Sequence, residues 1–188
     1  KAITDFHNKN YGSNYEYSEF RDGFKAELFN PSEWANIFKR SGAKYVVVTS
    51  QHHDGYCLWP NKEASESYNM PWNSVESGPK RDLVGDLTTA VREEGIKMGL
   101  YYSIWDWYNP YWTKKQQTIL SKGSLSVDTK AKGDRKNKYT KEEIDKAEQG
   151  LDKYIHEVMY PQVKELVNEY QPALLFSDGD WWMDYKKW

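Results

Sequence analysis

The sequence has one cysteine, no long hydrophobic run and almost no net charge. The lone Cys57 cannot form a disulfide within the chain, so packing must hold the fold. No segment approaches the roughly 18 consecutive apolar residues of a membrane helix, and residues 1–5 lack the apolar core of a signal peptide. With 26 Lys and Arg against 28 Asp and Glu, the formal charge of −2 disfavours a basic surface for nucleic acid. We therefore expect a soluble chain that binds neither membranes nor nucleic acids.

Apolar residues are also scarce, whereas aromatic residues are plentiful. The hydrophobic fraction is 38%, below the roughly 45–50% that is usual for globular domains, which predicts a thin core. Aromatic residues make up 16% of the chain, with nine Trp and fifteen Tyr. Such side chains combine a flat apolar face with a polar edge, which suits sugars, but ordinary packing in the core and on helix faces is the alternative.

A helix followed by a strand is the first predicted unit. Asn30 as N-cap, Pro31 at the first helical position and Glu33 in the first turn predict a helix start. Gly42 is typical of a left-handed helix end. Residues 43–49 are short, β-branched and apolar on both faces, which predicts a parallel strand covered on both sides by other layers.

The same unit recurs twice along the chain. Apolar stripes predict a second helix over residues 82–94 and a strand over residues 97–103. A third helix begins near Thr140 with the capping-box pattern and is interrupted at Pro161. It precedes a third strand over residues 173–177.

Three helix–strand units predict an α/β fold with a parallel sheet. Residues 111–139, rich in Lys, Gly, Ser and Thr, are interpreted as a solvated excursion. The charged residues within 130–136 are more typical of a solvent-exposed loop than of a ligand-binding surface. Three strands are too few to close a (β/α)8 barrel, which needs eight strands and about 250 residues. The chain is therefore interpreted as a fragment, and a small open sheet is the alternative.

A polar and aromatic cluster follows each predicted strand, at residues 50–56, 105–107 and 178–182. Because the carboxyl ends of parallel strands converge at one edge of a sheet, ligands bind there in α/β proteins. The three clusters together therefore predict one ligand site at this edge.

The first cluster contains His52, His53 and Asp54, which offer either metal ligands or a catalytic pair. Adjacent side chains of a strand point in opposite directions. Both imidazoles can therefore reach one ligand only if the strand has broken into a loop, and Gly55 permits that turn. One packed and one solvated His is the structural alternative. No second His or Cys cluster completes a ligand set, so a metal site is disfavoured.

Asp178 follows an apolar strand and is flanked by Phe176, Trp181 and Trp182. A carboxylate among aromatic rings suits attack on an oxocarbenium-like sugar carbon. Alternatively, Asp178 and Gly179 form a simple turn.

Four segments of the chain occur in a characteristic order. They are AKYVVVTSQHHDGYCLWP at residues 43–60, WNSVESGPKRDLVGDL at 72–87, GLYYS at 99–103 and LLFSDGDW at 174–181. Together they resemble family 29 of the glycoside hydrolases, the α-L-fucosidases. The resemblance covers most of residues 24–181 except the excursion.

The resemblance implies retaining hydrolysis of terminal α-L-fucose in a (β/α)8 TIM-like barrel, of which this chain would supply about three β/α units. Residues 1–188 would then be a fragment of a single catalytic barrel domain, with flanking barrel parts missing at both ends. In this family pattern Asp178 is the nucleophile that forms a fucosyl-enzyme intermediate. His52 and His53 match the pair that binds fucose hydroxyls, and Tyr101 matches an aromatic residue near the sugar. The implied partner is a fucosylated glycan, and no metal or other cofactor is implied.

Phe176 and Trp105 complete the predicted substrate-binding set. Phe176 stands where many family members have Trp, and it lacks an indole N–H. Trp105, like Trp107 and Trp112, is interpreted as lining a subsite that bears on linkage preference, with packing as the alternative.

The family's general acid/base, usually a Glu, would lie beyond Trp188, and a further sugar-binding His would precede Lys1. Asp106 and Asp180 are acid/base candidates by chemistry alone, because retaining hydrolysis needs a second carboxyl about 5–5.5 Å from the nucleophile. Two other functions stay open: a non-catalytic fucose-binding protein, and a metal-dependent hydrolase built on residues 52–54. Since the chain has no Asn-x-Ser/Thr sequon, we expect a bacterial periplasmic or extracellular enzyme of unspecified oligomeric state.

Overall fold

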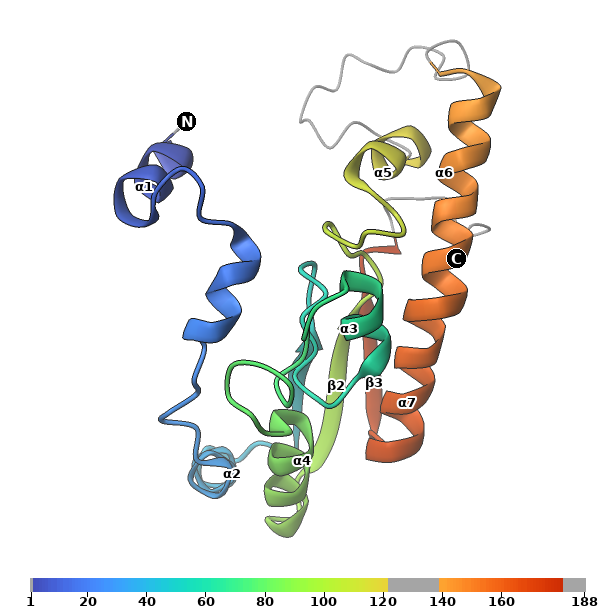
Figure 1. Ribbon diagram of the computed structural model, residues 1–188. Helices are drawn as coiled ribbons and strands as arrows, with labels where there is room; N and C mark the ends of the chain where they lie inside the picture. The colour runs from blue at the N-terminus through green and yellow to red at the C-terminus, as the bar shows by residue number, and fades with distance from the viewer. Residues whose placement is uncertain (1, 122–138, 181–188) are drawn as a thin grey trace.

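The structure is a computed structural model that describes residues 2–121 and 139–180. In this described part, β1 (Tyr45–Gln51), β2 (Lys97–Ser103) and β3 (Leu174–Asp178) form one parallel sheet in the order β1-β2-β3 (Figure 1). The predicted parallel α/β arrangement is therefore confirmed. The helical elements are α1 (Ala2–Tyr11), η1 (Tyr17–Gly23), α2 (Pro31–Arg40), α3 (Lys62–Tyr68), α4 (Leu83–Glu93), α5 (Lys114–Leu120), α6 (Lys141–Tyr154), η3 (Ile155–Met159) and α7 (Tyr160–Tyr170).

The predicted helix starts are formed by side-chain caps. Asn30 Oδ1 accepts the backbone N–H of Glu33 at 3.2 Å at the start of α2. Asp82 caps α4 in the same way. Thr140 and Glu143 form the reciprocal capping box of α6. None of the helices in the described part of the chain is long and apolar enough to cross a membrane.

The interruption predicted at Pro161 is a π turn rather than a break. Elements α6, η3 and α7 follow one another along one side of the molecule as a single long helix (Figure 1). Proline lacks an N–H, and its ring clashes with the carbonyl one turn earlier. The π-helical turn Ile155–Met159, in which the N–H of Tyr160 donates to the carbonyl of Ile155, accommodates this defect.

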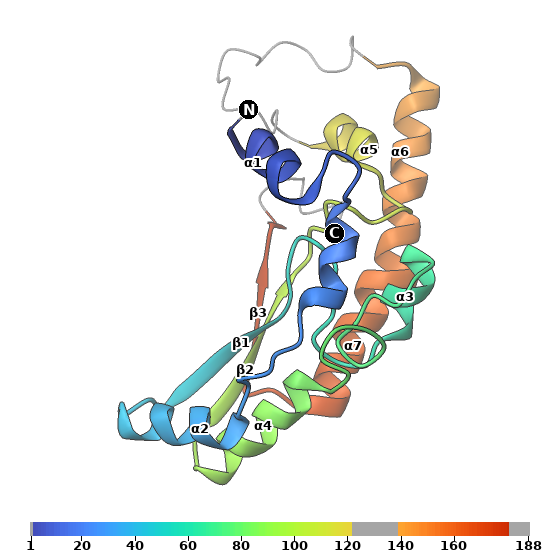
Figure 2. The same cartoon turned by 60° about the vertical axis from the view of Figure 1, so that its left-hand side comes forward.

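Helices cover only one face of the described sheet (Figure 2). On that face Met98, Leu100 and Tyr102 of β2 are buried with the apolar stripe of α4. On the other face Tyr45 is 64% exposed and Val47 37% exposed. The prediction that this strand is covered on both sides is therefore wrong for the described part of the chain, because no layer packs on its second face.

The predicted solvated excursion is wrong over its first part. Trp112 is fully buried and packs with Trp105, Leu151 and Tyr154, and α5 lies on α6. The helical spacing of α5 is short, so its pattern is easily missed beside the polar residues around it. The predicted charge run lies outside the described residues.

Candidate active site

The two histidines follow β1 at the carboxyl edge of the sheet, where the regular strand ends. The pairing of β1 with β2 shifts register between Thr49 and Gln51, and the N–H of Gly55 then donates to the carbonyl of His52 at 3.0 Å. This break brings the rings of His52 and His53 to a centroid separation of 4.2 Å. The two imidazoles therefore lie side by side, as a shared ligand requires.

Gly55 is required at this turn for two reasons. Its φ is +72°, in the left-handed region, and a Cβ there would clash with the carboxylate of Asp106 and the hydroxyl of Tyr68. The turn is thus packed directly against the segment that follows β2.

Tyr101 links the histidine turn to Asp178. Its hydroxyl donates a hydrogen bond of 2.5 Å to Asp178 Oδ2. Its ring stacks on His52, with centroids 5.7 Å apart, and on Phe176, with centroids 5.9 Å apart. Since Tyr101 and Phe176 are paired across the β2–β3 ladder, the strand register creates this arrangement. We call the three stacked rings of His52, Tyr101 and Phe176 the aromatic row.

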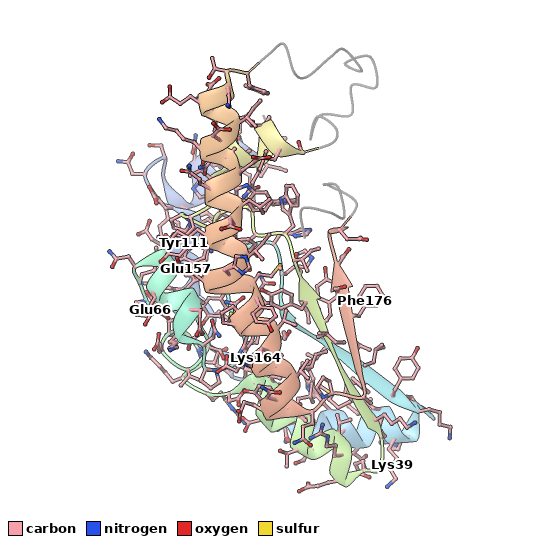
Figure 3. All side chains as sticks on the ribbon, turned by 90° about the vertical axis from the view of Figure 1, so that its right-hand side faces the viewer. Lys39, Glu66, Tyr111, Glu157, Lys164 and Phe176 are labelled. Atoms are coloured by element: carbon pink, nitrogen blue, oxygen red, sulfur yellow. The ribbon has the colours of Figure 1, made fainter. Side chains whose placement is uncertain are left out.

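The aromatic row lies on the face of the sheet that no described helix covers. Figure 3 shows Phe176 on the side of β3 that faces away from the long α6–α7 helix. Phe176 is 52% exposed, so its ring is available to a ligand. Asp178 ends β3 next to this row, and its backbone carbonyl is held by the N–H of Ile104 at 2.9 Å.

The environment determines the protonation of these groups. Burial, and then the hydrogen bond to Asp178, raise the pKa of the Tyr101 phenol above its ordinary value, so the phenol stays a hydrogen-bond donor. Burial, and then the neighbouring His53, lower the pKa of His52 below its ordinary value, while Asp54 and Asp178 act in the opposite direction. The site therefore combines an imidazole at His52 whose charged form is disfavoured with a phenol at Tyr101 that keeps its proton and donates to Asp178.

His53 is held on several sides by the segment after β2. Its Nδ1 lies 3.0 Å from the carbonyl oxygen of Trp105 and 2.7 Å from Ser103 Oγ. Its ring stacks on Trp107 at 4.6 Å, and its carbonyl accepts the N–H of Trp107 at 2.7 Å. Sequence reasoning missed Ser103, although a hydroxyl at the end of a strand, beside the expected site, was a usable signal.

The structure does not place the Trp105 side chain with the other predicted site residues. In place of the predicted sugar contact, its indole is fully buried, donates to Gln117 Oε1 at 3.1 Å and packs on Trp112. Trp107 is the residue of this segment that lies beside the histidines, and it is 40% exposed. Regular strand geometry would put Trp105 and Trp107 on the same face, but β2 ends at Ser103 and the irregular backbone after it separates the two side chains.

Asp54, Asp106 and Asp180 are the other acidic residues considered for the site, and their environments differ. Asp54 Oδ2 accepts from the Tyr17 hydroxyl at 2.8 Å. Asp106 is buried and accepts from the Tyr68 hydroxyl at 2.7 Å, and burial raises its pKa to about 6. Asp180 is exposed. Within residues 2–121 and 139–180, no three His, Cys, Asp or Glu side chains gather closely enough to hold a metal ion.

A cavity of about 300 Å³ adjoins the histidine turn on its β1 side. Its walls are largely aromatic and come from η1 and the residue after it, from the end of β1, from the segment that follows β1 and from Trp72. They include Tyr17, Phe20, Phe24, Thr49, Gln51, His52, Tyr56 and Trp72.

Comparisons with known proteins agree on one family. The family model described as Alpha-L-fucosidase matches residues 1–188. An alpha-L-fucosidase of Dictyostelium discoideum is 38% identical over 96% of this chain and 32% of its own length. One of Branchiostoma floridae is 38% identical over 99% of this chain and 34% of its own length. The chain thus spans about one third of the curated relatives that it matches.

Solved structures give the same result. The alpha-fucosidase of Thermotoga maritima in complex with fucose superposes with a TM-score of 0.64 at 39% identity, covering 97% of this chain and 36% of that chain. An alpha-L-fucosidase of Bacteroides thetaiotaomicron superposes with a TM-score of 0.65 at 27% identity, covering 90% of this chain and 31% of that chain.

Proposed function

Because the chain belongs to the alpha-L-fucosidase family, we propose that the protein that carries it is a retaining glycoside hydrolase that removes terminal α-L-fucose. Residues 1–188 form part of a single catalytic barrel domain, and the three-stranded sheet is about three β/α units of that (β/α)8 barrel. The substrate is a fucosylated glycan or oligosaccharide. Fucose in the Thermotoga maritima structure supports this choice of sugar.

The hydrogen bond from Tyr101 to Asp178 carries the proposal. It occupies Asp178 Oδ2, while Oδ1 accepts no hydrogen bond from the described residues. The carboxylate is thereby oriented with one free oxygen at the end of β3, on the open face of the sheet. A nucleophile in a retaining glycosidase needs such an arrangement: an oriented, accessible oxygen beside the sugar.

The reaction proceeds in two displacements. Asp178 Oδ1 bonds to the anomeric carbon of fucose as the bond from that carbon to the leaving oxygen breaks, and a general acid gives the leaving oxygen a proton. Water then attacks the same carbon, loses its proton to that residue acting as base, and releases Asp178. Asp106 is buried and already hydrogen-bonded, which disfavours it as the acid/base. We expect that residue outside residues 1–188, as the family resemblance implies.

The other site residues bind the sugar. His52 and His53 bind hydroxyl groups through their ring edges, and the free faces of the aromatic row accept the C6 methyl group. With Phe176 in place of the more common Trp, this position offers an apolar face and no N–H donor. Trp107 beside His53 replaces Trp105 in the substrate-binding set.

The test is Asp178→Asn in the full-length protein. We expect the turnover of an aryl α-L-fucoside to fall by at least about a thousandfold, because the covalent step loses its nucleophile. The matched control is Asp152→Asn, which changes an exposed carboxylate on α6 and should leave turnover unchanged. A 2-deoxy-2-fluoro-fucosyl fluoride should label the peptide that contains Asp178, as seen by mass spectrometry. Near-parental turnover of Asp178→Asn would remove the assigned nucleophile.

A non-catalytic fucose-binding protein is the second candidate. Such a protein would keep the sugar-binding residues of this chain and lack a working acid/base. It predicts that the full-length protein binds fucose in calorimetry without hydrolysing any fucoside.

A further inference from the structure

The surroundings of His53 Nδ1 are buried and contain two oxygen atoms. The carbonyl oxygen of Trp105 lies 3.0 Å from Nδ1, and Ser103 Oγ lies 2.7 Å from it. Ser103 Oγ also lies 2.8 Å from the same Trp105 carbonyl. Ser103 and Trp105 are both fully buried, whereas His53 is partly buried, so its two partners are shielded from water.

For a neutral imidazole, only one distribution of protons satisfies all three contacts. A carbonyl oxygen can only accept, so the short contact to Trp105 requires a proton on Nδ1. The single hydroxyl proton of Ser103 then points to the Trp105 carbonyl, which leaves an Oγ lone pair for the Nδ1–H of His53. With the proton on Nε2 instead, a ring lone pair and a carbonyl lone pair would face each other at 3.0 Å.

We propose that the Trp105 carbonyl and the Ser103 hydroxyl hold His53 as its Nδ1–H tautomer, so that Nε2 acts as a hydrogen-bond acceptor for one sugar hydroxyl. This inference rests on the proposed function, since it specifies the polarity of the same sugar site. In a neutral imidazole, the bond made by one nitrogen determines the role of the other. Ser103 is thus a positioning residue. The sugar hydroxyl that faces His53 must donate its hydrogen bond to Nε2.

Neighbouring rings also hold the His53 imidazole in one orientation, so its Nε2 lone pair points in a single direction. Trp107 stacks on one face at 4.6 Å, and the His52 ring lies 4.2 Å away. The Trp107 N–H holds the backbone of His53 at 2.7 Å. A group that only accepts hydrogen bonds, such as fluorine, should therefore be rejected at this position of the sugar.

The first experiment reads the tautomer directly and does not depend on activity. The full-length protein is labelled with ring-15N histidine, and the His53 signals are assigned by their loss in His53→Gln. We expect a protonated Nδ1 and an unprotonated Nε2 at neutral pH. In Ser103→Ala the Nδ1–H proton should shift and exchange faster, because one of its two acceptors is gone, whereas Ser74→Ala, which removes another buried hydroxyl bonded to a carbonyl, should leave it unchanged. A proton on Nε2 in the wild type, or an unchanged Nδ1–H in Ser103→Ala, would overturn the proposal.

The second experiment measures the polarity of the sugar contact. Aryl α-L-fucosides with the 3- or 4-hydroxyl replaced by fluorine or by hydrogen are compared with the parent fucoside. At one of these positions kcat/KM should fall about 10- to 100-fold, with fluorine no better tolerated than hydrogen, because neither substituent can donate. If fluorine preserves kcat/KM at every position where hydrogen abolishes it, His53 donates and the proposal fails. Ser103→Ala should raise KM by about two- to tenfold with little change in kcat.

The two experiments separate this inference from the proposed function. If the full-length protein hydrolyses no fucoside, the proposed function fails, and the 15N measurement still decides the tautomer. If fucosides are hydrolysed and Nε2 carries the proton, only the inference fails.

Discussion

Asp106 and Asp178 follow neighbouring strands, yet their surroundings differ. Asp106 is buried and accepts from the Tyr68 hydroxyl and the Asn109 side chain. Asp178 lies at the open face and accepts from Tyr101. Burial raises the pKa of Asp106 to about 6, so this carboxyl takes up its proton much more readily than an exposed one. At the scale of the residue, the local environment thus makes Asp106 a buried structural carboxyl and leaves Asp178 accessible to a ligand.

The raised pKa of Asp106 predicts a pH dependence of stability. The folded chain keeps a proton on Asp106 up to about pH 6, whereas the unfolded carboxyl releases it near pH 4. Folded molecules therefore bind more protons in this window, and the free energy of unfolding falls as the pH rises through it. Relative to Asp106→Asn, the wild type should lose about 2 kcal/mol between pH 4.5 and 7.

Urea unfolding of the full-length protein at several pH values in that range checks this difference. Asp145→Asn, at an exposed position of α6, serves as control and should run parallel to the wild type. Parallel curves for Asp106→Asn as well would show that the pKa of Asp106 is not raised.

Tyr101→Phe isolates the contribution of one hydroxyl group. The substitution keeps the stacked ring but removes the donor to Asp178 Oδ2. We expect kcat/KM for an aryl fucoside to fall about tenfold or more, because the carboxylate loses its orientation. The neighbouring Tyr102→Phe removes a hydroxyl bonded to Gln162, on the helix-covered face, and should change stability rather than turnover. Equal kinetics in both variants would contradict the assigned role.

At the scale of the element, α5 and α6 approach closely because of one glycine. A Cβ at Gly150 would lie 2.7 Å from the Tyr111 carbonyl and 2.7 Å from Gln116 Nε2. Gln116 also donates to the carbonyl of Lys146 at 3.0 Å, which ties the two helices together. The π turn at the end of α6 then lets the same helix continue past Pro161 towards β3.

Gly150→Ala should therefore destabilise the protein, although helix propensity alone predicts that Ala stabilises a helix relative to Gly. In an open helix interior, Ala stabilises relative to Gly by about 1 kcal/mol. At Gly150 we expect a loss of about 1–3 kcal/mol instead, because backbone and side-chain atoms of the α5 region must move. Chemical denaturation measures the change. Gly23→Ala, where nothing lies within 4 Å of the added methyl group, is the control and should be close to neutral. A gain in stability at Gly150 would show that the two helices are not in close contact.

At the scale of the whole molecule, the described sheet has an open apolar face. Val47, Leu174 and Phe176 are each exposed there, while the opposite face is covered by helices. Such a face is expected to be buried in a complete protein. The chain spans about one third of its relatives, and closure of the sheet into the proposed barrel would cover this face with further strands.

Barrel closure predicts a contrast between two valines of similar exposure. Val47 is 37% exposed on the open sheet face, and Val167 is 43% exposed on α7. In the full-length protein, Val47→Asp should cost at least about 3 kcal/mol, because the barrel encloses an unpaired charge. Val167→Asp, on a helix outside the barrel, should cost less than about 1 kcal/mol. Thermal unfolding of the two variants gives the comparison, and equal small losses would argue against closure.

Much of the fold was predictable because its signals are local. The caps at Asn30 and Thr140 satisfy orphan backbone groups within one turn, and β-branched runs form the strands. For the site, the order of polar clusters after parallel strands predicted that His52, His53 and Asp178 meet at one edge. The stacking of Tyr101 on Phe176 was not predictable in this way, because it depends on the register between two strands far apart in the sequence.

By itself the sequence determined the capped starts of α2 and α6, the parallel arrangement of the strands, and which edge of the sheet carries the polar groups. Only the tertiary structure decided which of Trp105 and Trp107 is buried, which carboxyl is buried, and which proton His53 keeps. The physical reason is that burial and hydrogen-bond partners are properties of segments brought together from distant parts of the chain. Caps, turns and side-chain periodicity act between residues only a few positions apart.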